Sequence, residues 1–378
     1  MTRVADAELS DLWSGSYTAD SNGHGTGIGL LRTTGDGTLR AVRTAAPAES
    51  PSFLVQHPFL PVVYAAQEAA QTVQTFTIVD AADVDATGVD ATGVDAAGVN
   101  PAGYLEPLGA AWPAGAAVCH VTVDPDGRYA IATCWGDGTV HFYELDPAGA
   151  IVADHVAAPA IDPYADLPGG VITVPEAAPR ISRAHASLVL PDGRVLTTDL
   201  GFDLARVWRV EPGVGLVADH EVTLPAGSGP RHPVLHPGGA VSIVTEYSID
   251  VVTVALGPDG RYAITDVAPV FAGGPHPGDA AAHISLDARG QHVLVTVRGS
   301  NRVAMLAVRD DGARLEAVAD VDCGGNWPRH HLQRGSFLYV ANQLSDTIAT
   351  FRLDASGLPS ELLQTLQTGS PTCLIERR

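Results

Sequence analysis

The chain has 378 residues, of which 46% are apolar, 40 are glycine and 27 are proline, so it is long enough to bury a large core and too apolar to be disordered. Its formal net charge is −21, and a surface of that sign repels phosphate backbones, which argues against a nucleic-acid partner. All 22 basic residues are arginine, so chemistry that needs a lysine nucleophile or a Schiff base is excluded.

One strand-turn-strand unit recurs along the chain. Six copies can be aligned, at residues 50–80, 117–149, 183–213, 229–260, 281–312 and 327–357. Each begins with an apolar strand that ends at a turn such as Pro-Asp-Gly-Arg (125–128), in which glycine supplies the positive φ. A second apolar strand, a short polar turn and a third strand follow, and an Asp/Gly turn closes the unit. Turns at about every 8–12 residues predict an all-β protein built from repeated β-meanders.

The two ends of the chain each carry part of a further unit. Joined, residues 14–40 and 370–378 would complete a seventh copy, close the ring and remove exposed sheet edges. We therefore predict an all-β, seven-bladed β-propeller whose ring is closed by N- and C-terminal strands that share one blade, with residues 1–378 as a single domain. Two inserts, at about 82–100 and 155–180, are expected to be variable loops, and the second could form a rim or lid.

Polar side chains recur at two equivalent positions of the copies. The first column lies just before the first strand and holds His120, His185, Arg231, His232, His283, Arg329 and His330. The second column lies where the second strand ends and holds Glu68, Trp135, Glu246, Arg298 and Gln343. Equivalent positions of successive blades converge near a propeller axis, and a purely structural repeat would reuse one residue type, so these mixed columns predict a pocket. The structural alternative stays open for the histidines, which could hydrogen-bond neighbouring blades or point into a blade core.

Six segments resemble the lactonase family of seven-bladed propellers, which includes propeller-type 6-phosphogluconolactonases and fungal 3-carboxymuconate cyclases. In chain order they are CHVTVDPDGRY, RAHASLVLPDGR, GSGPRH, VTEYS, VTVRGSN and VANQLSDTIATFRLD. The resemblance runs from about residue 14 to the C-terminus and implies four catalytic residues, which are His185, Arg231, Glu246 and Arg298. Arg183, Thr245 and Val297 depart from the family pattern, which has a histidine and two asparagines there. These departures bear on the substrate more than on the fold.

The resemblance and the two columns together predict a lactone hydrolase for a sugar-derived lactone that carries a phosphate or carboxylate. Either Glu246 or His185 would act as the general base for the attacking water. Arg231 and Arg298 would stabilise the oxyanion or hold the anionic group. The residues expected to contact the substrate are His120, His232, His283, Arg329, Gln343 and Glu68. Two alternatives remain, a carboxymuconate-type cycloisomerase that uses the same residues and a non-catalytic propeller for binding or scaffolding.

No metal or cofactor and no association with a membrane is expected. The four cysteines form no Cys-x-x-Cys pair, and arginines outnumber carboxylates among the candidate residues, which disfavours a bound cation. The N-terminal segment has no apolar stretch of the signal-peptide type, and no apolar run reaches the length of a membrane span. We therefore expect a monomeric cytoplasmic protein with reduced thiols, whose partner is a small anionic lactone.

Overall fold

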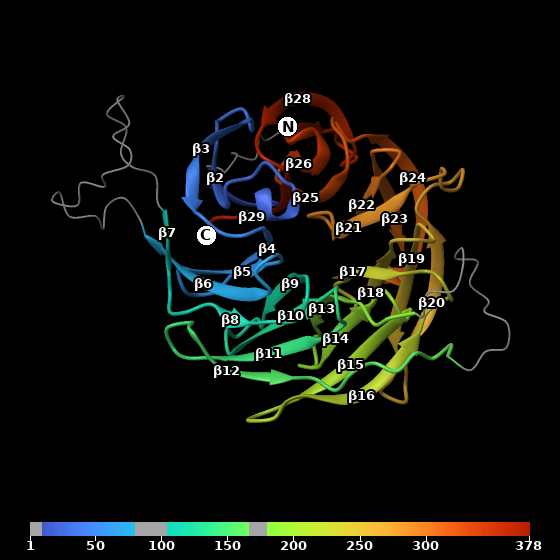
Figure 1. Ribbon diagram of the computed structural model, residues 1–378. Helices are drawn as coiled ribbons and strands as arrows, with labels where there is room; N and C mark the ends of the chain where they lie inside the picture. Colours follow the sequence, from blue (N-terminus) through green and yellow to red (C-terminus); the bar gives the residue numbers. More distant parts are fainter. Residues whose placement is uncertain (1–9, 80–103, 166–179) are drawn as a thin grey trace.

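The computed structural model describes residues 10–79, 104–165 and 180–378. Their strands form seven antiparallel sheets arranged in a ring around a central axis (Figure 1). The seven-bladed, all-β propeller predicted from the repeat is therefore confirmed. The first insert, about 82–100, lies outside the described residues.

Within each of the six blades predicted from clear copies, the strands follow one another from the axis outward. The first of these blades consists of β4 (Pro51–Gln56), β5 (Val62–Gln67), β6 (Thr72–Val79) and β7 (Tyr104–Pro107), with β8 (Trp112–Pro113) beside β6. The second consists of β9 (Val118–Val123), β10 (Tyr129–Cys134), β11 (Val140–Leu145) and β12 (Ile151–Val156). The third consists of β13 (Ala184–Val189), β14 (Val195–Asp199), β15 (Leu204–Glu211) and β16 (Gly215–Thr223). The fourth consists of β17 (Pro230–Leu235), β18 (Val241–Thr245), β19 (Asp250–Leu256) and β20 (Tyr262–Pro269). The fifth consists of β21 (Ala280–Leu286), β22 (His292–Arg298), β23 (Arg302–Arg309) and β24 (Arg314–Asp322). The sixth consists of β25 (Pro328–Arg334), β26 (Phe337–Asn342), β27 (Thr347–Leu353) and β28 (Pro359–Gln367).

The two ends of the chain share the seventh blade, as the sequence predicted. This blade consists of β29 (Pro371–Glu376), β1 (Leu12–Ser16), β2 (Ile28–Thr33) and β3 (Leu39–Ala46). The innermost strand, β29, pairs antiparallel with β1, and Trp13 lies opposite Ile375. Each innermost strand contacts the innermost strands of both neighbouring blades, so the ring is closed.

A fourth, outermost strand in every blade is absent from the sequence prediction, which expected three. In β28, for example, most residues are exposed or half-buried, and β24 alternates between exposed and more buried positions. Outer strands of this kind pack one face only weakly, so they lack the continuous apolar run that marked the inner strands.

Apolar side chains and a few polar ones join neighbouring blades. Trp13, Trp208 and Tyr64 are fully buried. The hydroxyl of Tyr64 donates to the carbonyl of Gly149 in the next blade, at 2.6 Å. The imidazole of His57, in the turn between β4 and β5, contacts the carbonyl of Gly127 in the next blade at 3.2 Å and is 4% exposed. Turns of adjacent blades are therefore locked together by specific contacts.

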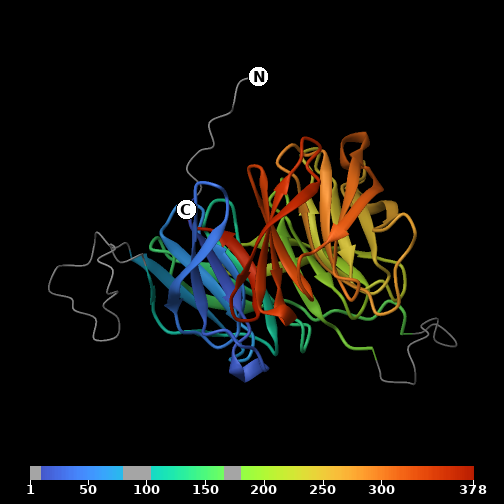
Figure 2. The same cartoon turned by 90° about the horizontal axis from the view of Figure 1, so that it is seen from above.

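The two faces of the ring differ. The short helix η1 (Ala19–Ser21) lies on one face, and the C-terminus, which follows β29, lies on the other (Figure 2). We call these the η1 face and the opposite face. No helix among the described residues is both long enough and apolar enough to cross a membrane.

The described part of the second insert packs on the outer strands of the blade that begins with β13. Arg206 donates to the carbonyls of Ala158 and Pro159, and the hydroxyl of Tyr164 donates to the carbonyl of Leu224 at 2.6 Å. Residues 166–179 lie outside the described residues, so the expected lid stays a prediction.

Candidate active site

Each innermost strand carries one extra residue at the same point of its pairing with the second strand, as in a β-bulge. The bulged residues form what we call the bulge ring, which consists of Ser52, Cys119, His185, Arg231, Ala282, Arg329 and Thr372. The next residue of each strand forms the axial ring, which consists of Phe53, His120, Ala186, His232, His283, His330 and Cys373. The first column, predicted to lie just before the first strand, instead lies within the innermost strands and divides between two layers.

The second column forms a complete ring at the ends of the second strands. This strand-end ring consists of Tyr17, Glu68, Trp135, Leu200, Glu246, Arg298 and Gln343. Five of its seven members were predicted, whereas Tyr17 and Leu200 were not. Tyr17 directly follows β1, the second strand of the closing blade, just as Glu68 follows β5. An alignment of the N-terminal segment with the other copies could have found it.

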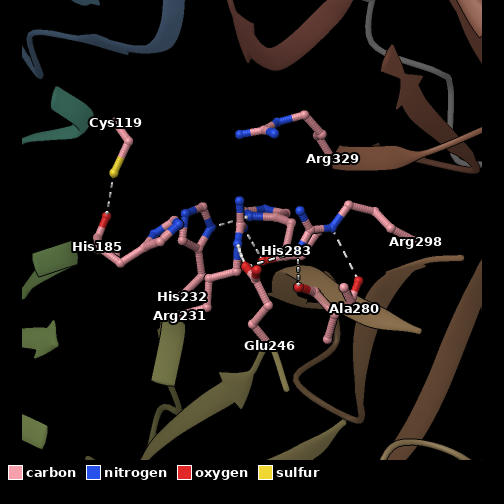
Figure 3. Close-up of polar contacts among 12 residues, drawn as sticks. Cys119, His185, Arg231, His232, Glu246, Ala280, His283, Arg298 and Arg329 are labelled. Carbon is pink, nitrogen blue, oxygen red and sulfur yellow. Dashed lines mark hydrogen bonds and ion pairs between the residues drawn. The ribbon is translucent and has the colours of Figure 1, made fainter. Parts of the chain in front are cut away.

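Glu246 lies between two guanidinium groups (Figure 3). Its Oε2 accepts a hydrogen bond from Nε of Arg231 at 3.0 Å and lies 2.8 Å from Nη2 of Arg298. Its Oε1 forms no hydrogen bond with any described residue. The Glu246 side chain is 16% exposed, whereas those of Arg231 and Arg298 are 4% and 8% exposed. One carboxylate oxygen is therefore fixed, and the other remains available to water or a ligand.

Backbone carbonyls of β21 hold both arginines in place. Arg231 donates through Nη1 to the carbonyl of Ala282, and Arg298 donates to the carbonyls of Ala280 and Ala281 at 3.1 and 3.0 Å (Figure 3). Ala282 belongs to the bulge, where pairing with β22 is interrupted, so its carbonyl is free to accept. The local break in the sheet thus supplies the acceptors that orient the charged groups.

Arg329 is a third guanidinium group on the same side of the axial ring and is half-buried. Among the described residues it forms no ion pair; its Nη1 lies 3.4 Å from Oε1 of Gln343, and its Cζ lies 4.9 Å from the ring centre of Tyr17. The hydroxyl of Tyr17 donates to both carboxylate oxygens of Glu68, at 3.1 and 3.0 Å. Arg329 therefore has the least directly compensated charge of the three arginines, which suits it to bind an anion.

The site holds more positive than negative charge, since three guanidinium groups accompany the carboxylates of Glu246 and Glu68. Desolvation alone would raise the pKa of Glu246, but Arg298 and Arg231 outweigh it, so the pKa lies below its ordinary value and the group is ionised at neutral pH. Burial, and then the charge of Arg298, lower the pKa of Arg231. A positive excess inside a chain of net charge −21 is a local arrangement that favours an anionic ligand.

His185 of the bulge ring is neutral at physiological pH. Burial, reinforced by the charge of Arg231, places the pKa of His185 well below its ordinary value. Its Nδ1 is buried and has no hydrogen-bond partner within residues 10–79, 104–165 and 180–378, and its carbonyl accepts from the thiol of Cys119 at 3.4 Å. An imidazole that resists protonation this strongly is a weak proton acceptor at neutral pH. Of the two candidate bases, Glu246 is the better placed.

The axial ring fills the axis one residue further along the innermost strands. Its five aromatic side chains form a closed circle in which each ring contacts the next. The ring centres are 4.3 Å apart for Phe53 and His120, 5.4 Å for His120 and His232, and 5.2 Å for His232 and His283. They are 3.9 Å apart for His283 and His330, and 5.9 Å apart for His330 and Phe53. The Nδ1 atoms of His232 and His283 are 2.9 Å apart. His232 thus contacts both His120 and His283, and all three lie in a different layer from Arg231, so their expected contact with substrate stays a prediction.

Although several histidines gather on the axis, no group of three or more His, Cys, Asp or Glu in the described ranges is arranged to hold a metal ion. All four cysteines are free and buried.

Known proteins share this architecture. The family model described as lactonase, 7-bladed beta-propeller matches residues 11–376. The chain belongs to the lactonase family. A 6-phosphogluconolactonase of Bacillus subtilis is 24% identical to this lactonase-family chain over 273 residues, which cover 69% of the chain and 73% of the relative. An uncharacterized protein of Lactococcus lactis is 26% identical over 254 residues, which cover 65% and 70%.

Two solved structures resemble the lactonase-family chain over nearly its whole length. The periplasmic gluconolactonase of Pseudomonas aeruginosa has a TM-score of 0.81 at 23% identity and covers 97% of this chain and 98% of its own. A putative 6-phosphogluconolactonase from Bacteroides uniformis has a TM-score of 0.79 at 22% identity and covers 98% and 99%. At these identities the likeness establishes the shared fold.

In this lactonase-family chain, the four residues that the resemblance implies as catalytic come from three consecutive blades. Arg231, Glu246 and Arg298 are in direct contact, and His185 is the neighbour of Arg231 in the bulge ring. The structure also brings to this side of the axial ring three of the residues expected to bind substrate, which are Glu68, Arg329 and Gln343.

Two exposed aromatic side chains, those of Trp135 and Tyr247, belong to residues of the strand-end turns beside the charged groups. Arg183, which replaces a histidine of the family pattern, stacks on Trp135 with its Cζ 3.7 Å from the ring centre. Trp135 is 37% exposed, and Tyr247, next to Glu246, is 53% exposed. Exposed aromatic faces beside a buried charged cluster can contact the ring of a bound ligand.

Proposed function

We propose that the chain hydrolyses a lactone derived from a sugar acid and carrying a phosphate or a carboxylate. The observation that carries the proposal is the carboxylate of Glu246, which Arg231 and Arg298 hold through one oxygen while no residue that the structure describes bonds to the other. Membership of the lactonase family and the name 6-phosphogluconolactonase given to one relative support the same reaction class. The excess of guanidinium groups supports an anionic substrate.

In the proposed mechanism, Oε1 of Glu246 removes a proton from a water molecule as the water oxygen attacks the lactone carbonyl carbon. Arg231 and Arg298 stabilise the negative charge that develops on the carbonyl oxygen. The ring C–O bond then breaks, and the proton returns from Glu246 to the leaving alkoxide, which yields a hydroxy acid. His185, neutral at this pH, hydrogen-bonds the water without accepting its proton.

Arg329 is the proposed anchor for the phosphate or carboxylate of the substrate, because no described carboxylate forms an ion pair with it. An anion bound there also offsets the positive field around Glu246. Because that field lowers the pKa of Glu246, binding of an anionic substrate makes the carboxylate a stronger base.

The non-catalytic alternative is less well supported. Members of the bulge ring and the strand-end ring meet on one side of the axial ring, and the groups that meet are ionisable. A scaffold has no use for buried charges, which are costly to desolvate. The cycloisomerase uses the same residues and differs only in taking up no water.

A hydrolysis screen tests the substrate class. We expect kcat/KM for 6-phosphogluconolactone to exceed that for unphosphorylated gluconolactone by about tenfold or more, because a hydrogen bond to a charged group contributes about 1.5–3 kcal/mol. A carboxylated butenolide completes the series. Equal kcat/KM values for charged and neutral lactones would exclude an anionic substrate class. If the protein hydrolysed none of these lactones, the proposed lactonase activity would be excluded. Ring closure of an unsaturated acid without water uptake would favour the cycloisomerase.

The role of Glu246 can be tested by substitution. Glu246→Gln is expected to lower kcat by about 100-fold or more, because an amide cannot accept the proton of the attacking water. The matched control is Glu221→Gln, since Glu221 pairs with Arg206 at 2.8 Å on the outer strands β15 and β16, and kcat should stay within about twofold of the wild type. If both Glu246→Gln and His185→Ala kept wild-type rates, the mechanism would be wrong.

A further inference from the structure

A second cavity, of about 560 Å³, lies on the opposite face of the ring, behind the axial ring as seen from Glu246. Its walls come from the C-terminal halves of all seven innermost strands. Arg231 and Arg329, in contrast, lie near the N-terminal ends of these strands, and Glu246 and Arg298 lie at the ends of the second strands that pair with them. We propose that this cavity is a second binding site, which takes an uncharged, polyhydroxylated small molecule of sugar size. The volume is within the range of about 300–1,000 Å³ typical of small-molecule sites.

Three imidazoles of the axial ring form the floor of the cavity, those of His120, His283 and His330. Nδ1 of His120 accepts the backbone N–H of Ser187, and Nδ1 of His330 accepts that of Leu374, both at 3.4 Å. The ring proton of each of these two neutral imidazoles is therefore assigned to Nε2. Neither Nε2 has a hydrogen-bond partner in the described part of the chain, so the floor offers N–H donors to an occupant.

Residues of the cavity wall also carry three polar atoms that are closed to solvent and have no hydrogen-bond partner among the described residues. They are Oγ of Ser187, Oε1 of Gln333 and Nδ1 of His331. Ser187 is 4% exposed and His331 is 1% exposed. A buried polar group without a hydrogen bond is costly, and hydroxyl groups can both donate to and accept from such groups. Hydroxyl groups of an occupant can accept directly from the Nε2–H groups of the floor, and they can satisfy these buried atoms once the side chains turn toward the cavity.

The cavity favours a neutral occupant over an ion. Burial lowers the pKa of His120, with help from Arg231, and that of His331, each to about 3, so these side chains carry no charge at neutral pH. The formal charges among the lining residues are those of Glu376 and Arg378. Glu376 pairs with Arg334 at 2.9 Å, and Arg378 is an exposed residue whose backbone contacts Gln56. Apolar side chains such as Leu188 and Leu332 complete the lining and suit the C–H faces of a sugar ring.

Calorimetric titration with D-glucose and myo-inositol tests this site, with D-gluconate as the charged comparison. We expect the neutral probes to bind with a Kd of about 1–10 mM. Leu188→Trp, which fills the cavity, should weaken binding by about tenfold or more. Leu362→Trp is the matched control, since Leu362 lies on the outer strand β28 and is 49% exposed, and it should leave the Kd unchanged. Glu246→Gln should leave it unchanged too, because the proposed site is separate from the lactone site.

A second measurement needs no cavity variant. In wild-type protein with ¹⁵N-labelled histidine, the Nε2 signals of His120 and His330 should shift when a neutral probe is added. The proposal is overturned if neither neutral probe binds, if gluconate binds this site more tightly than they do, or if Glu246→Gln abolishes binding. It is also overturned if the histidine signals do not move.

Discussion

Tyr17 lies between Arg329 and Glu68 and contacts both side chains. Its ring packs against the guanidinium group and its hydroxyl donates to the carboxylate. Desolvation raises the pKa of Tyr17, so the hydroxyl keeps its proton throughout the neutral range. Because Glu68 is held by this donor, its charge is kept from closer approach to Arg329, which is left able to bind an anion.

Tyr17→Phe tests this arrangement. Without its donor, Glu68 is expected to turn toward Arg329 and compete with the substrate anion. We expect KM for an anionic lactone to rise by about tenfold and kcat to change by less than about threefold. The control Tyr129→Phe, in β10, should change neither value. An equal rise in KM for a neutral lactone would indicate general distortion of the site instead.

The bulged innermost strand is the element that builds the site. Its extra residue places successive side chains in different layers, so that Arg231 contacts Glu246 while His232, in the axial ring, contacts His283. An alignment by turn position cannot show this, because one inserted residue leaves the apolar pattern unchanged. The inner strands, ring closure and most of the strand-end ring follow from the repeat. The division of the first column, and the polar outermost strands, depend on pairing register and exposure.

The contribution of a contact between turns of adjacent blades can be measured by comparing two glycine substitutions. Gly127 and Gly193 occupy equivalent turns with φ of 71° and 83°, so alanine is strained at both and should cost about 1–2 kcal/mol. A Cβ at Gly127 would also meet the imidazole of His57, whereas nothing lies near a Cβ at Gly193. Gly127→Ala should therefore lower the free energy of urea unfolding by about 1–3 kcal/mol more than Gly193→Ala. Equal losses would mean that the His57 contact adds nothing to stability.

At the scale of the whole molecule, the ring buries neutral histidines at its axis. Burial lowers the pKa of all six, which are His120, His185, His232, His283, His330 and His331. Below a pH of about 6.5 the unfolded chain binds protons that the folded protein does not. The contribution of these histidines to the free energy of unfolding is therefore fully present above that pH. It is lost as the pH falls toward the lower pKa values that the histidines have in the folded protein.

This linkage predicts acid sensitivity. Between pH 6.5 and 5, the free energy of unfolding should fall by up to about 1.4 kcal/mol per pH unit for each buried histidine. Urea midpoints measured at intervals across this range test the slope. His330→Phe should reduce the slope by about one such contribution, whereas His24→Gln, at a side chain 73% exposed, should not. A constant midpoint from pH 7 to pH 5 would contradict the prediction.

The innermost strand of the closing blade, β29, is the last strand of the ring to be synthesised. It supplies Thr372 and Cys373 to the two rings and part of the wall of the second cavity. Neither binding face can therefore be complete while the ribosome still holds this segment. A chain interrupted before Pro371 would have six complete blades and a seventh that lacks its innermost strand, which leaves a gap at the axis. Ligand binding at either face therefore requires that β29 has joined the ring, and it distinguishes closed rings from truncated molecules that keep most of their secondary structure.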